Sequence, residues 1–408
     1  MAKRLVITPH GHPVDWIQSQ FQAHASTIKA LAWIFVLSRL FFEEIAGLAY
    51  VYLPHGWAEY PAGVLGTEAP LAYRVLIRMW AHWDGQWYLM IARQGYPYPQ
   101  STAFFPLYPM LVRYLGGSSV IGALAISLCA TALAVVMLYR LVRLEFGDRV
   151  AWFSVLALLF FPTSFYTQAV YSEAIFLALA VSSLYYLRKG QYWWSGMLGG
   201  LASLAGIYGV FLAAPLAWTL WRTKGNHLKS LAPVVLIPAG VLLYMLYLTP
   251  HFLDPLVFES AQKYWGRGTI ALFLVTLWQG AVAAYHAAGA AISPQVLFQT
   301  GQPSQIVMNF YSFGFAVYAL AIFVTTARWL PTYLLMYEGL ALLLPLSYPS
   351  AGYPLLSLPR LILEAFPVFI GTGLLLDRYP KARIPYFVVS VLLAALFVSL
   401  FATSHWVA

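Results

Sequence analysis

Apolar segments long enough to form helices recur along almost the whole chain, and short polar stretches separate them. A transmembrane helix needs about 20 apolar residues, and fewer where neighbouring helices bury it. Several segments approach this length, at residues 28–53, 118–139, 150–163, 168–187, 191–206, 208–221, 230–249, 304–326, 329–347, 361–377 and 384–403. The stretches 150–187 and 191–221 can be divided differently. The pattern therefore predicts an all-α polytopic membrane protein with about 11 transmembrane helices, in a range of about 10–13.

Three longer segments separate the predicted spans and lie on one side of the membrane, at residues 54–117, 250–303 and 348–360. In the first of these outer loops, Pro70 to Arg93 is predicted to be helical. In the second, residues 270–290 are apolar enough to span. A span there would invert every later segment and place the basic residues at 378–383 outside. We therefore expect an interfacial or re-entrant helix at this position.

Composition excludes a soluble protein. Hydrophobic residues make up 61% of the chain and charged residues 9%, with a mean hydropathy of +0.71, whereas soluble domains carry about 25% charged residues. No polar linker interrupts the spans, so residues 1–408 are predicted to form a single transmembrane domain. The net charge of +9 does not indicate a nucleic-acid partner, because the cations lie in loops and at the ends of spans.

The distribution of Lys and Arg predicts the orientation. A cytoplasmic amino terminus, bearing Lys3 and Arg4, puts most of the 23 basic residues inside, as the positive-inside rule requires. No apolar core follows at signal-peptide distance, so the first span is expected to be an anchor. The lone Cys129 excludes an intramolecular disulfide. The protein would lie in the plasma membrane of a prokaryote or the endoplasmic reticulum membrane of a eukaryote.

One outer acid stands out, Asp84 in the stretch AHWDGQWYLMIARQGYPYPQSTAFFPLYP (81–109). A carboxylate can take a proton from an attacking hydroxyl, and guanidinium groups can hold a phosphate and stabilise developing charge. This combination suits transfer from a lipid-linked phosphate donor. Other outer carboxylates are few: Glu59, Glu68, Glu173, Asp254 and Glu259. The alternative is structural, with Asp84 capping a helix or pairing with Arg78 or Arg93.

Further outer residues are candidates for substrate contacts. The candidates for the donor phosphate are Arg360, Arg267, Lys263, Arg78 and Arg93, and those for the sugar or acceptor are Trp83, Trp87, Tyr88, Tyr96, Glu173 and Gln262. Each has a plainer alternative. The arginines and Lys263 can anchor the interface or face solvent, and Glu173 can bond to a neighbouring helix. Trp83, Trp87 and Tyr88, with Trp80, suit the headgroup zone.

Ionisable residues inside the predicted spans are expected to be structural. Arg39 and Glu43 are one helical turn apart and should pair. Glu338 and Glu364 are expected to be buried acids of unknown use. No cluster of His, Asp and Glu has the spacing of metal ligands, so we expect no metal or cofactor.

The stretch HWDGQWYLMIARQGYPYPQSTAFFPLYPMLVR resembles the signature of the PIG-V family of mannosyltransferases. The matching positions are Trp83, Asp84, Ile91, Ala92, Gly95, Tyr96 and Ala103 to Pro106. The resemblance continues in FPTSFYTQAVYSEAIF (161–176), DPLVFESAQKYWGR (254–267) and SLPRLILEAFP (357–367). One departure is Gly206 in LASLAGIYG, where relatives are expected to carry an arginine.

The resemblance implies a GT-C type glycosyltransferase. Such an enzyme would transfer mannose, or a related hexose, from a polyprenyl- or dolichyl-phosphate donor to a hydroxyl of a lipid, glycolipid or protein, with inversion at the sugar carbon. Asp84 would be the general base, and membrane lipids would surround the reaction. Neither the sugar nor the acceptor follows from the residues themselves.

Other function classes make different demands on the sequence. A transporter or lipid flippase should show an internal repeat or charges at mid-membrane depth, and we find no convincing repeat. A non-catalytic assembly factor would not need Asp84. A membrane acyltransferase or phosphatase would need a histidine nucleophile or a His–Asp cluster in a loop, and neither is present in the sequence.

Overall fold

The computed structural model describes residues 13–56, 64–65, 69–225, 228–299 and 302–407, and over these residues it is helical. The predicted cytoplasmic terminus with Lys3 and Arg4 lies outside the described residues. The first half contains α1 (Pro13–Tyr52), α2 (Leu71–Leu76), η1 (Arg78–Ala81), α3 (Asp84–Gln94), η2 (Pro99–Ala103), α4 (Leu107–Tyr114), α5 (Val120–Phe146), α6 (Asp148–Leu159), η3 (Ser164–Thr167), α7 (Glu173–Arg188) and α8 (Tyr192–Ala205).

The second half continues in the same way, and its described residues contain no strand beyond one isolated antiparallel bridge. Its elements are η4 (Ile207–Leu212), α9 (Ala213–Lys224), η5 (Leu228–Leu231), α10 (Ala232–Phe252), α11 (Val257–Tyr264), α12 (Phe273–Ala287), η6 (Ala288–Ala290), α13 (Pro294–Leu297), α14 (Gln302–Thr326), α15 (Thr332–Leu346), α16 (Leu358–Leu361), α17 (Pro367–Arg378), η7 (Pro380–Ala382) and α18 (Arg383–Ala402). The prediction of an all-α protein is confirmed.

Among the described residues, four helices are long and apolar enough to cross a membrane: Val120–Phe146, Lys229–Phe252, Gln305–Thr326 and Pro380–Ala402. The shorter Thr332–Leu346 is also apolar. Local sequence explains the limits of α5. The Ser119 side chain caps its first turn by accepting from Gly122 N–H, and Gly147 ends it at a φ of 87°, which glycine adopts without steric cost. The count of about 11 spans stays a prediction.

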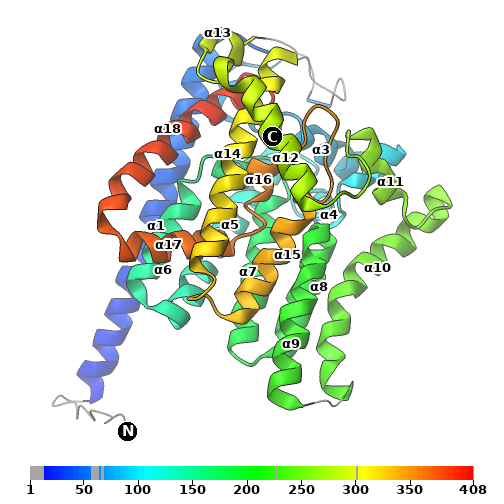
Figure 1. Cartoon of the computed structure of the whole chain (residues 1–408). Coiled ribbons are helices and arrows are strands. Elements are labelled where there is room, and N and C mark those ends of the chain that lie inside the picture. The colour runs from blue at the N-terminus through cyan, green and yellow to red at the C-terminus, as the bar shows by residue number, and fades with distance from the viewer. Residues whose placement is uncertain (1–12, 57–63, 66–68, 226–227, 300–301, 408) are drawn as a thin grey trace.

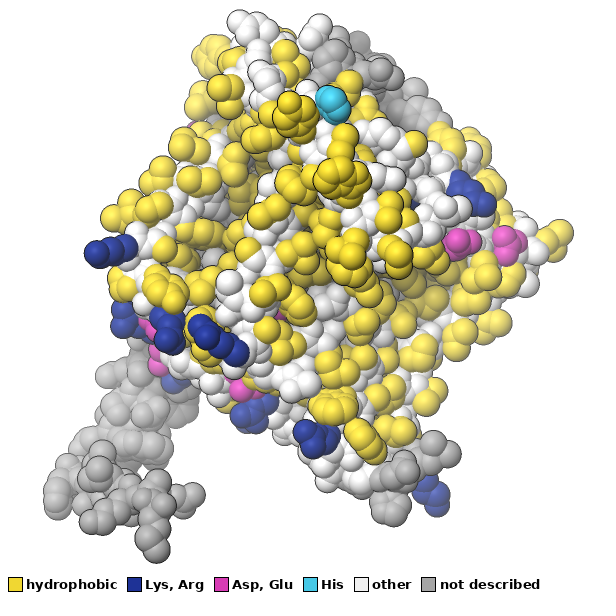
Figure 2. All heavy atoms as spheres, viewed as in Figure 1, with side chains coloured by type: hydrophobic (Ala, Val, Ile, Leu, Met, Phe, Trp, Pro, Cys, Tyr) yellow, Lys and Arg dark blue, Asp and Glu magenta, His cyan; other side chains and the backbone are white. Residues whose placement is uncertain are grey.

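The helices form a bundle in which α1 packs on α18, α7 lies between α5 and α8, and α10 lies beside α8. Figure 1 shows the short elements α3, α11 and α16 together in its upper half. Most Lys and Arg side chains that are visible in Figure 2 lie along its lower and left edge, with a broad hydrophobic band above them. Such a band is what a lipid-facing surface requires.

Helix α12 corresponds to the segment 270–290 that we expected to be interfacial or re-entrant. It has 15 residues and packs on α14. At 1.5 Å per residue it is about 22 Å long, shorter than the hydrocarbon core of about 30 Å. Its interfacial or re-entrant placement stays a prediction.

Two predicted spans contain irregular backbone before their α-helix begins. Helix α7 begins at Glu173 instead of residue 168, and α17 begins at Pro367 instead of residue 361. Pro367 is the first residue of α17, a position that suits proline because no N–H donor is needed there, and Pro162 lies in the irregular segment before α7. The backbone between 160 and 172, which is irregular apart from η3, is buried in protein, as irregular backbone among membrane helices must be. These two segments carry much of the candidate site.

The predicted continuous helix from Pro70 to Arg93 is wrong. The chain forms α2, η1 and α3 instead, with a break at His82 and Trp83. Trp83 adopts a φ of 57°, which a bulky residue adopts only when its surroundings enforce it. Helix α3 starts directly after this break, and Asp84 is its first residue.

Candidate functional site

Asp84 and Glu173 both lie against the guanidinium of Arg360. Asp84 Oδ2 is 2.5 Å from Arg360 Nη1, and Glu173 Oε1 is 3.1 Å from Arg360 Nε. The exposed fractions of the side chains are 24% for Asp84, 15% for Arg360 and 5% for Glu173. Two carboxylates therefore share one cation away from bulk water, an arrangement that is stable only while all partners remain in place.

Two tyrosine rings complete the surroundings of Arg360. Its guanidinium carbon is 5.6 Å from the ring centre of Tyr166 and 5.5 Å from that of Tyr171, both within the range of cation–π attraction. Burial acts to lower the pKa of Arg360, but the carboxylates of Asp84 and Glu173 outweigh it and hold the pKa well above its usual value. Arg360 is therefore charged at every working pH.

Tyr171 also holds the backbone at Asp84. Its hydroxyl accepts from the Asp84 N–H and donates to the His82 carbonyl, with both distances 3.2 Å. A Cβ at Gly85 would come within 3.3 Å of the Val170 carbonyl oxygen, so glycine permits the close approach of residues 170–171. The positive φ of Trp83 and this contact together direct Asp84 toward Arg360.

The aromatic residues after Asp84 form a core. Trp87 is 3% exposed and stacks on Phe104 with ring centres 5.8 Å apart, and Trp265 meets both rings edge-on. The Tyr88 hydroxyl lies 2.7 Å from Ser172 Oγ. Trp87, Tyr88 and Trp80 are thus buried in protein, where their rings fill the space between neighbouring segments. Their expected position in the headgroup zone stays a prediction.

The half-buried Tyr96 has a similar supporting position. Its hydroxyl donates to the Phe104 carbonyl at 2.7 Å, and its ring packs on those of Tyr244 and Tyr247. Trp83 is half-buried next to Asp84, and its indole N–H has no hydrogen-bond partner in the structure. Of the four aromatic candidates for sugar contact, Trp83 alone therefore retains both exposure and an unused donor beside the acid.

The second outer loop reaches the site through Arg267. Its backbone forms the isolated bridge with Ser350, and its Nη2 donates to the Leu356 carbonyl at 3.3 Å. Burial lowers the pKa of Arg267 below its usual value, and the nearby charge of Arg360 lowers it further. Arg267 and Arg360 are therefore close enough for their charges to interact.

Three other candidates for the donor phosphate, and Gln262 from the candidates for the sugar or acceptor, lie on α11, η1 and α3. Lys263 is exposed on α11, and Gln262 is half-buried beside it. Arg78 is half-buried at the start of η1. Arg93 donates to the carbonyls of Val64 and Ser118. It follows Asp84 by nine residues in α3, a separation of about 13 Å along the helix, so the prediction that Arg93 binds the phosphate beside Asp84 is wrong. Its role is to tie the end of α3 to the neighbouring loops.

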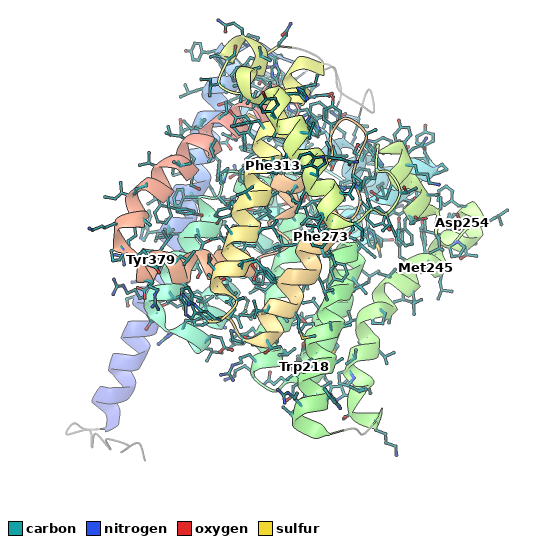
Figure 3. All side chains as sticks on the ribbon, in the orientation of Figure 1. Trp218, Met245, Asp254, Phe273, Phe313 and Tyr379 are labelled. Atoms are coloured by element: carbon teal, nitrogen blue, oxygen red, sulfur yellow. The ribbon has the colours of Figure 1, made fainter. Side chains whose placement is uncertain are left out.

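Among the described outer acids, Asp84 and Glu173 reach Arg360. Asp254 accepts from the Leu256 N–H in the turn between α10 and α11, and Figure 3 shows it at the outer edge of the molecule. Glu259 is exposed on α11. Glu59 and Glu68 lie outside the described residues. Asp84 and Arg360, which were both candidates from the sequence, are thus in direct contact.

The predicted pair between Arg39 and Glu43 is wrong. Arg39 is 7% exposed and donates to the Thr167 hydroxyl at 3.0 Å. Glu43 accepts from the indole of Trp80 and the amide of Gln168. The irregular segment before α7 supplies partners for both residues, and these tertiary contacts replace the local ion pair.

Glu338 and Glu364 are buried, as predicted, with exposed fractions of 0% and 7%. Both oxygens of Glu338 and Oε2 of Glu364 have no hydrogen-bond partner in the structure. A Cβ built at Gly206 would lie 3.9 Å from Glu364 Oε2. The position where an arginine was expected therefore faces this acid.

Sequence reasoning did not single out Tyr166 and Tyr171, although they lie in the segment FPTSFYTQAVYSEAIF that was noted for its resemblance. The sequence contains 28 tyrosines, and no local pattern distinguishes these two. Within the described residues there is also no group of three or more His, Cys, Asp or Glu that could hold a metal ion.

A family model described as Mannosyltransferase (PIG-V) matches residues 69–231, which confirms the resemblance over the first outer loop and the helices that follow it. The chain is 33% identical over 124 residues to "GPI mannosyltransferase 2" of Drosophila melanogaster, covering 26% of each protein. It is 30% identical over 189 residues to "GPI alpha-1,6-mannosyltransferase 2" of Mus musculus, covering 42% of this chain and 38% of the mouse protein. The matches thus span well under half the length of these two relatives.

Comparison with solved structures gives weaker similarity. ArnT from Cupriavidus metallidurans bound to undecaprenyl phosphate aligns with a TM-score of 0.39 at 14% identity, covering 91% of this chain and 78% of ArnT. The oligosaccharyltransferase of Archaeoglobus fulgidus in the apo form aligns with a TM-score of 0.41 at 14% identity, covering 89% and 54%. Scores at this level are too low to assign a fold.

Proposed function

We propose that this chain is a membrane mannosyltransferase that uses Asp84 as its general base. In this proposal the donor is a polyprenyl- or dolichyl-phosphate-linked mannose, or a related hexose. The acceptor is a hydroxyl group of a lipid, glycolipid or protein at the outer membrane face. The reaction inverts the configuration of the sugar carbon and needs no metal or other cofactor.

The observation that carries the proposal is the 2.5 Å contact between Asp84 and Arg360. It joins a carboxylate from the first outer loop to a guanidinium from the third, and Asp84 lies within the residues that the mannosyltransferase model matches. A base and a phosphate-binding cation side by side are the two groups that transfer from a sugar phosphate requires. The two relatives named above, both called mannosyltransferases, support mannose as the sugar.

The proposed step is a single displacement. The acceptor oxygen forms a bond to the sugar carbon while the bond from that carbon to the phosphate oxygen breaks. The acceptor proton passes to Asp84, and the electron pair leaves with the polyprenyl phosphate. Arg360 stabilises the charge that develops on the leaving phosphate, and Arg267 adds a second positive charge nearby.

Arg360 has enough donors to serve both partners. A guanidinium carries five N–H groups. In the structure one nitrogen donates to Asp84, and another faces Glu173. Nη2 donates to neither acid in the structure, so it can meet a phosphate oxygen while Nη1 still orients Asp84. Glu173 would then balance the positive charge of Arg360 from its buried side.

Exposure favours Asp84 over Glu173 as the base. The Asp84 side chain is 24% exposed and the Glu173 side chain is 5% exposed. An acceptor hydroxyl must approach within hydrogen-bond distance of the base, and Asp84 is the more accessible carboxylate of the two. Glu173 is better suited to positioning Arg360.

The test is transfer by the purified full-length protein. It is incubated with polyprenyl-phosphate mannose, labelled in the sugar, and a membrane lipid extract. We expect label in an acceptor fraction, and a loss of about 10²- to 10⁴-fold in rate for Asp84→Asn. Asp254→Asn, which changes an outer acid remote from Arg360, is the matched control and should keep full activity. Undiminished transfer by Asp84→Asn would remove the proposed base.

The alternative of a transporter or lipid flippase is not favoured by any contact described above. The same experiment separates the two. A transporter reconstituted in vesicles would move the lipid-linked sugar between leaflets without transferring the sugar to an acceptor. If the protein were a transporter, both the unmodified protein and Asp84→Asn would therefore leave the covalent structure of the donor unchanged.

A further inference from the structure

Two arginines stack on one tryptophan at the turn between α14 and α15. The guanidinium carbon of Arg328 is 4.6 Å from the ring centre of its neighbour Trp329. The guanidinium carbon of Arg378, in the last turn of α17, is 4.9 Å from the Trp329 ring centre. Both distances are within the range of cation–π attraction. The two positive charges therefore lie within about 10 Å of each other, although they repel.

The acids near this pair already have basic partners. The helix ends around it form a basic edge, which carries three ion pairs: Asp377 with Arg149, Asp148 with Arg143, and Glu145 with Arg188. Within the described part of the chain, the guanidinium groups of Arg328 and Arg378 have no hydrogen bond or ion pair. Their two charges are thus available to an anion from outside the chain.

Stacking on Trp329 leaves the donors of both arginines free. The five N–H groups of a guanidinium lie in its plane, whereas stacking uses its flat face. Arginine binds a phosphate through two parallel N–H···O bonds made by that edge. Arg328 and Arg378 are exposed, and Trp329 is half-buried between them and the protein. The tryptophan therefore holds two phosphate-binding groups together at the surface.

Apolar side chains beside the arginines indicate that the phosphate belongs to a lipid. Helix α14 ends just before Arg328, and α18 begins five residues after Arg378. Each helix carries an exposed apolar stripe, made of Val317 and Val324 on α14 and of Ile384, Val388 and Leu392 on α18. Spacings of seven and four residues place such side chains on one face of a helix. Exposed apolar faces of membrane helices contact acyl chains.

The aromatic residues of the pair agree with a position at the membrane surface. Tyr379 follows Arg378, is 51% exposed, and lies at the left edge of the molecule in Figure 3. Tryptophan and tyrosine are enriched where the hydrocarbon meets the headgroups. In Figure 2 most of the visible Lys and Arg side chains also lie along the lower and left edge, next to the hydrophobic band.

We infer that Arg328, Trp329 and Arg378 form a binding site for the phosphate of an anionic phospholipid, whose acyl chains lie along α14 and α18. An anionic lipid is favoured over a zwitterionic one because the site carries two uncompensated positive charges. The inference does not rest on the proposed function, since that function concerns α3 and α16. A lipid bound here would join the turn between α14 and α15 to the end of α17.

The experiment measures lipid binding to the purified full-length protein by native mass spectrometry in a neutral detergent. Phosphatidylglycerol and phosphatidylcholine with the same acyl chains are titrated separately. We expect the unmodified protein to bind phosphatidylglycerol more tightly. The double variant Arg328→Gln/Arg378→Gln should bind phosphatidylglycerol about 30-fold more weakly, since each basic group near an anionic lipid contributes a factor of about five. Equal binding of the two lipids by the unmodified protein would overturn the inference.

The double variant Arg140→Gln/Lys189→Gln is the matched control. It removes the same net charge from two exposed positions, and neither of these side chains stacks on an aromatic ring in the structure. Its affinity for phosphatidylglycerol should stay within about threefold of the unmodified protein, because salt screens charges that lie away from the site. An equal loss in both double variants would mean that the lipid responds to total charge, and this result would overturn the inference.

A charge-conserving variant separates the guanidinium geometry from the charge. Arg328→Lys/Arg378→Lys keeps the net charge but loses the planar fork and the stacking of a guanidinium on Trp329. We expect several-fold weaker binding of phosphatidylglycerol, and undiminished binding would overturn the proposed site. All of these substitutions are at exposed positions, so the variants should fold. Absence of sugar transfer by the unmodified protein would refute the proposed function and leave this inference standing.

Discussion

Replacing Arg360 with methionine removes the one positive charge that Asp84 and Glu173 contact. Methionine is similar in length and keeps much of the packing against Tyr166 and Tyr171, so the change isolates the charge. Removing one partner of a buried ion pair costs about 3–5 kcal/mol, because the remaining charge is left without compensation. Here the uncompensated group is chiefly Glu173, which is 5% exposed.

The assay is thermal unfolding of the purified protein in detergent, followed by loss of the monomer peak or by tryptophan fluorescence. With an unfolding entropy of roughly 2 cal/mol/K per residue, a chain of 408 residues should lose about 4–6 °C in its midpoint. Adding Glu173→Gln to Arg360→Met removes the stranded charge and should recover at least half of that loss. Glu173→Gln alone should destabilise the protein, since it breaks the pair from the other side.

Arg113→Met is the control, because Arg113 is an exposed arginine on α4 and its substitution should shift the midpoint by about 1 °C or less. The reasoning fails if Arg360→Met shifts the midpoint no more than this control does. It also fails if the effects of Arg360→Met and Glu173→Gln add, because additivity would mean that the two side chains do not interact.

Three further outcomes are expected. Tyr171→Phe removes the hydroxyl between the Asp84 N–H and the His82 carbonyl, so it should cost about 1 kcal/mol in stability and slow transfer several-fold. An unchanged transfer rate would show that this hydroxyl does not position the base. Arg93→Gln should leave the KM for the donor within about twofold, as its bonds go to backbone carbonyls; a tenfold rise in KM would return Arg93 to the phosphate site. Trp87→Ala should lower the free energy of unfolding by about 3–5 kcal/mol, because the Trp87 ring is buried against Phe104. A change in this free energy within the error of the measurement would contradict a core role for Trp87.

Helix locations could be predicted well from the sequence, since each predicted span coincides with a helix for most of its length. Apolar residues in runs of helical length have few other ways to satisfy their backbone in a membrane. The errors occurred where proline or a tertiary contact intervened. The chain breaks at Trp83 because the Tyr171 hydroxyl and residue 170 pack against it, and those residues lie more than 80 positions later.

The candidate site could be predicted in part. Asp84 and Arg360 were selected because an acid and cations are costly and rare beside apolar spans. Glu173 was assigned to the sugar or acceptor, whereas its carboxylate contacts Arg360. For Arg39 the predicted partner was wrong. Helical spacing suggested an ion pair with Glu43, whereas in the structure Arg39 donates to the hydroxyl of Thr167.

The sequence by itself determined that this is a helical membrane protein with a small set of outer acids and bases, because hydrophobicity and charge are properties of single residues and short windows. It also carried the resemblance to the PIG-V family, which rests on residue identities. The tertiary structure alone decided that Asp84, Glu173 and Arg360 meet, and that Trp87 and Tyr88 form a core beneath them. Such contacts join residues up to 276 positions apart. The packing of irregular segments decides these distances, and no local pattern encodes them.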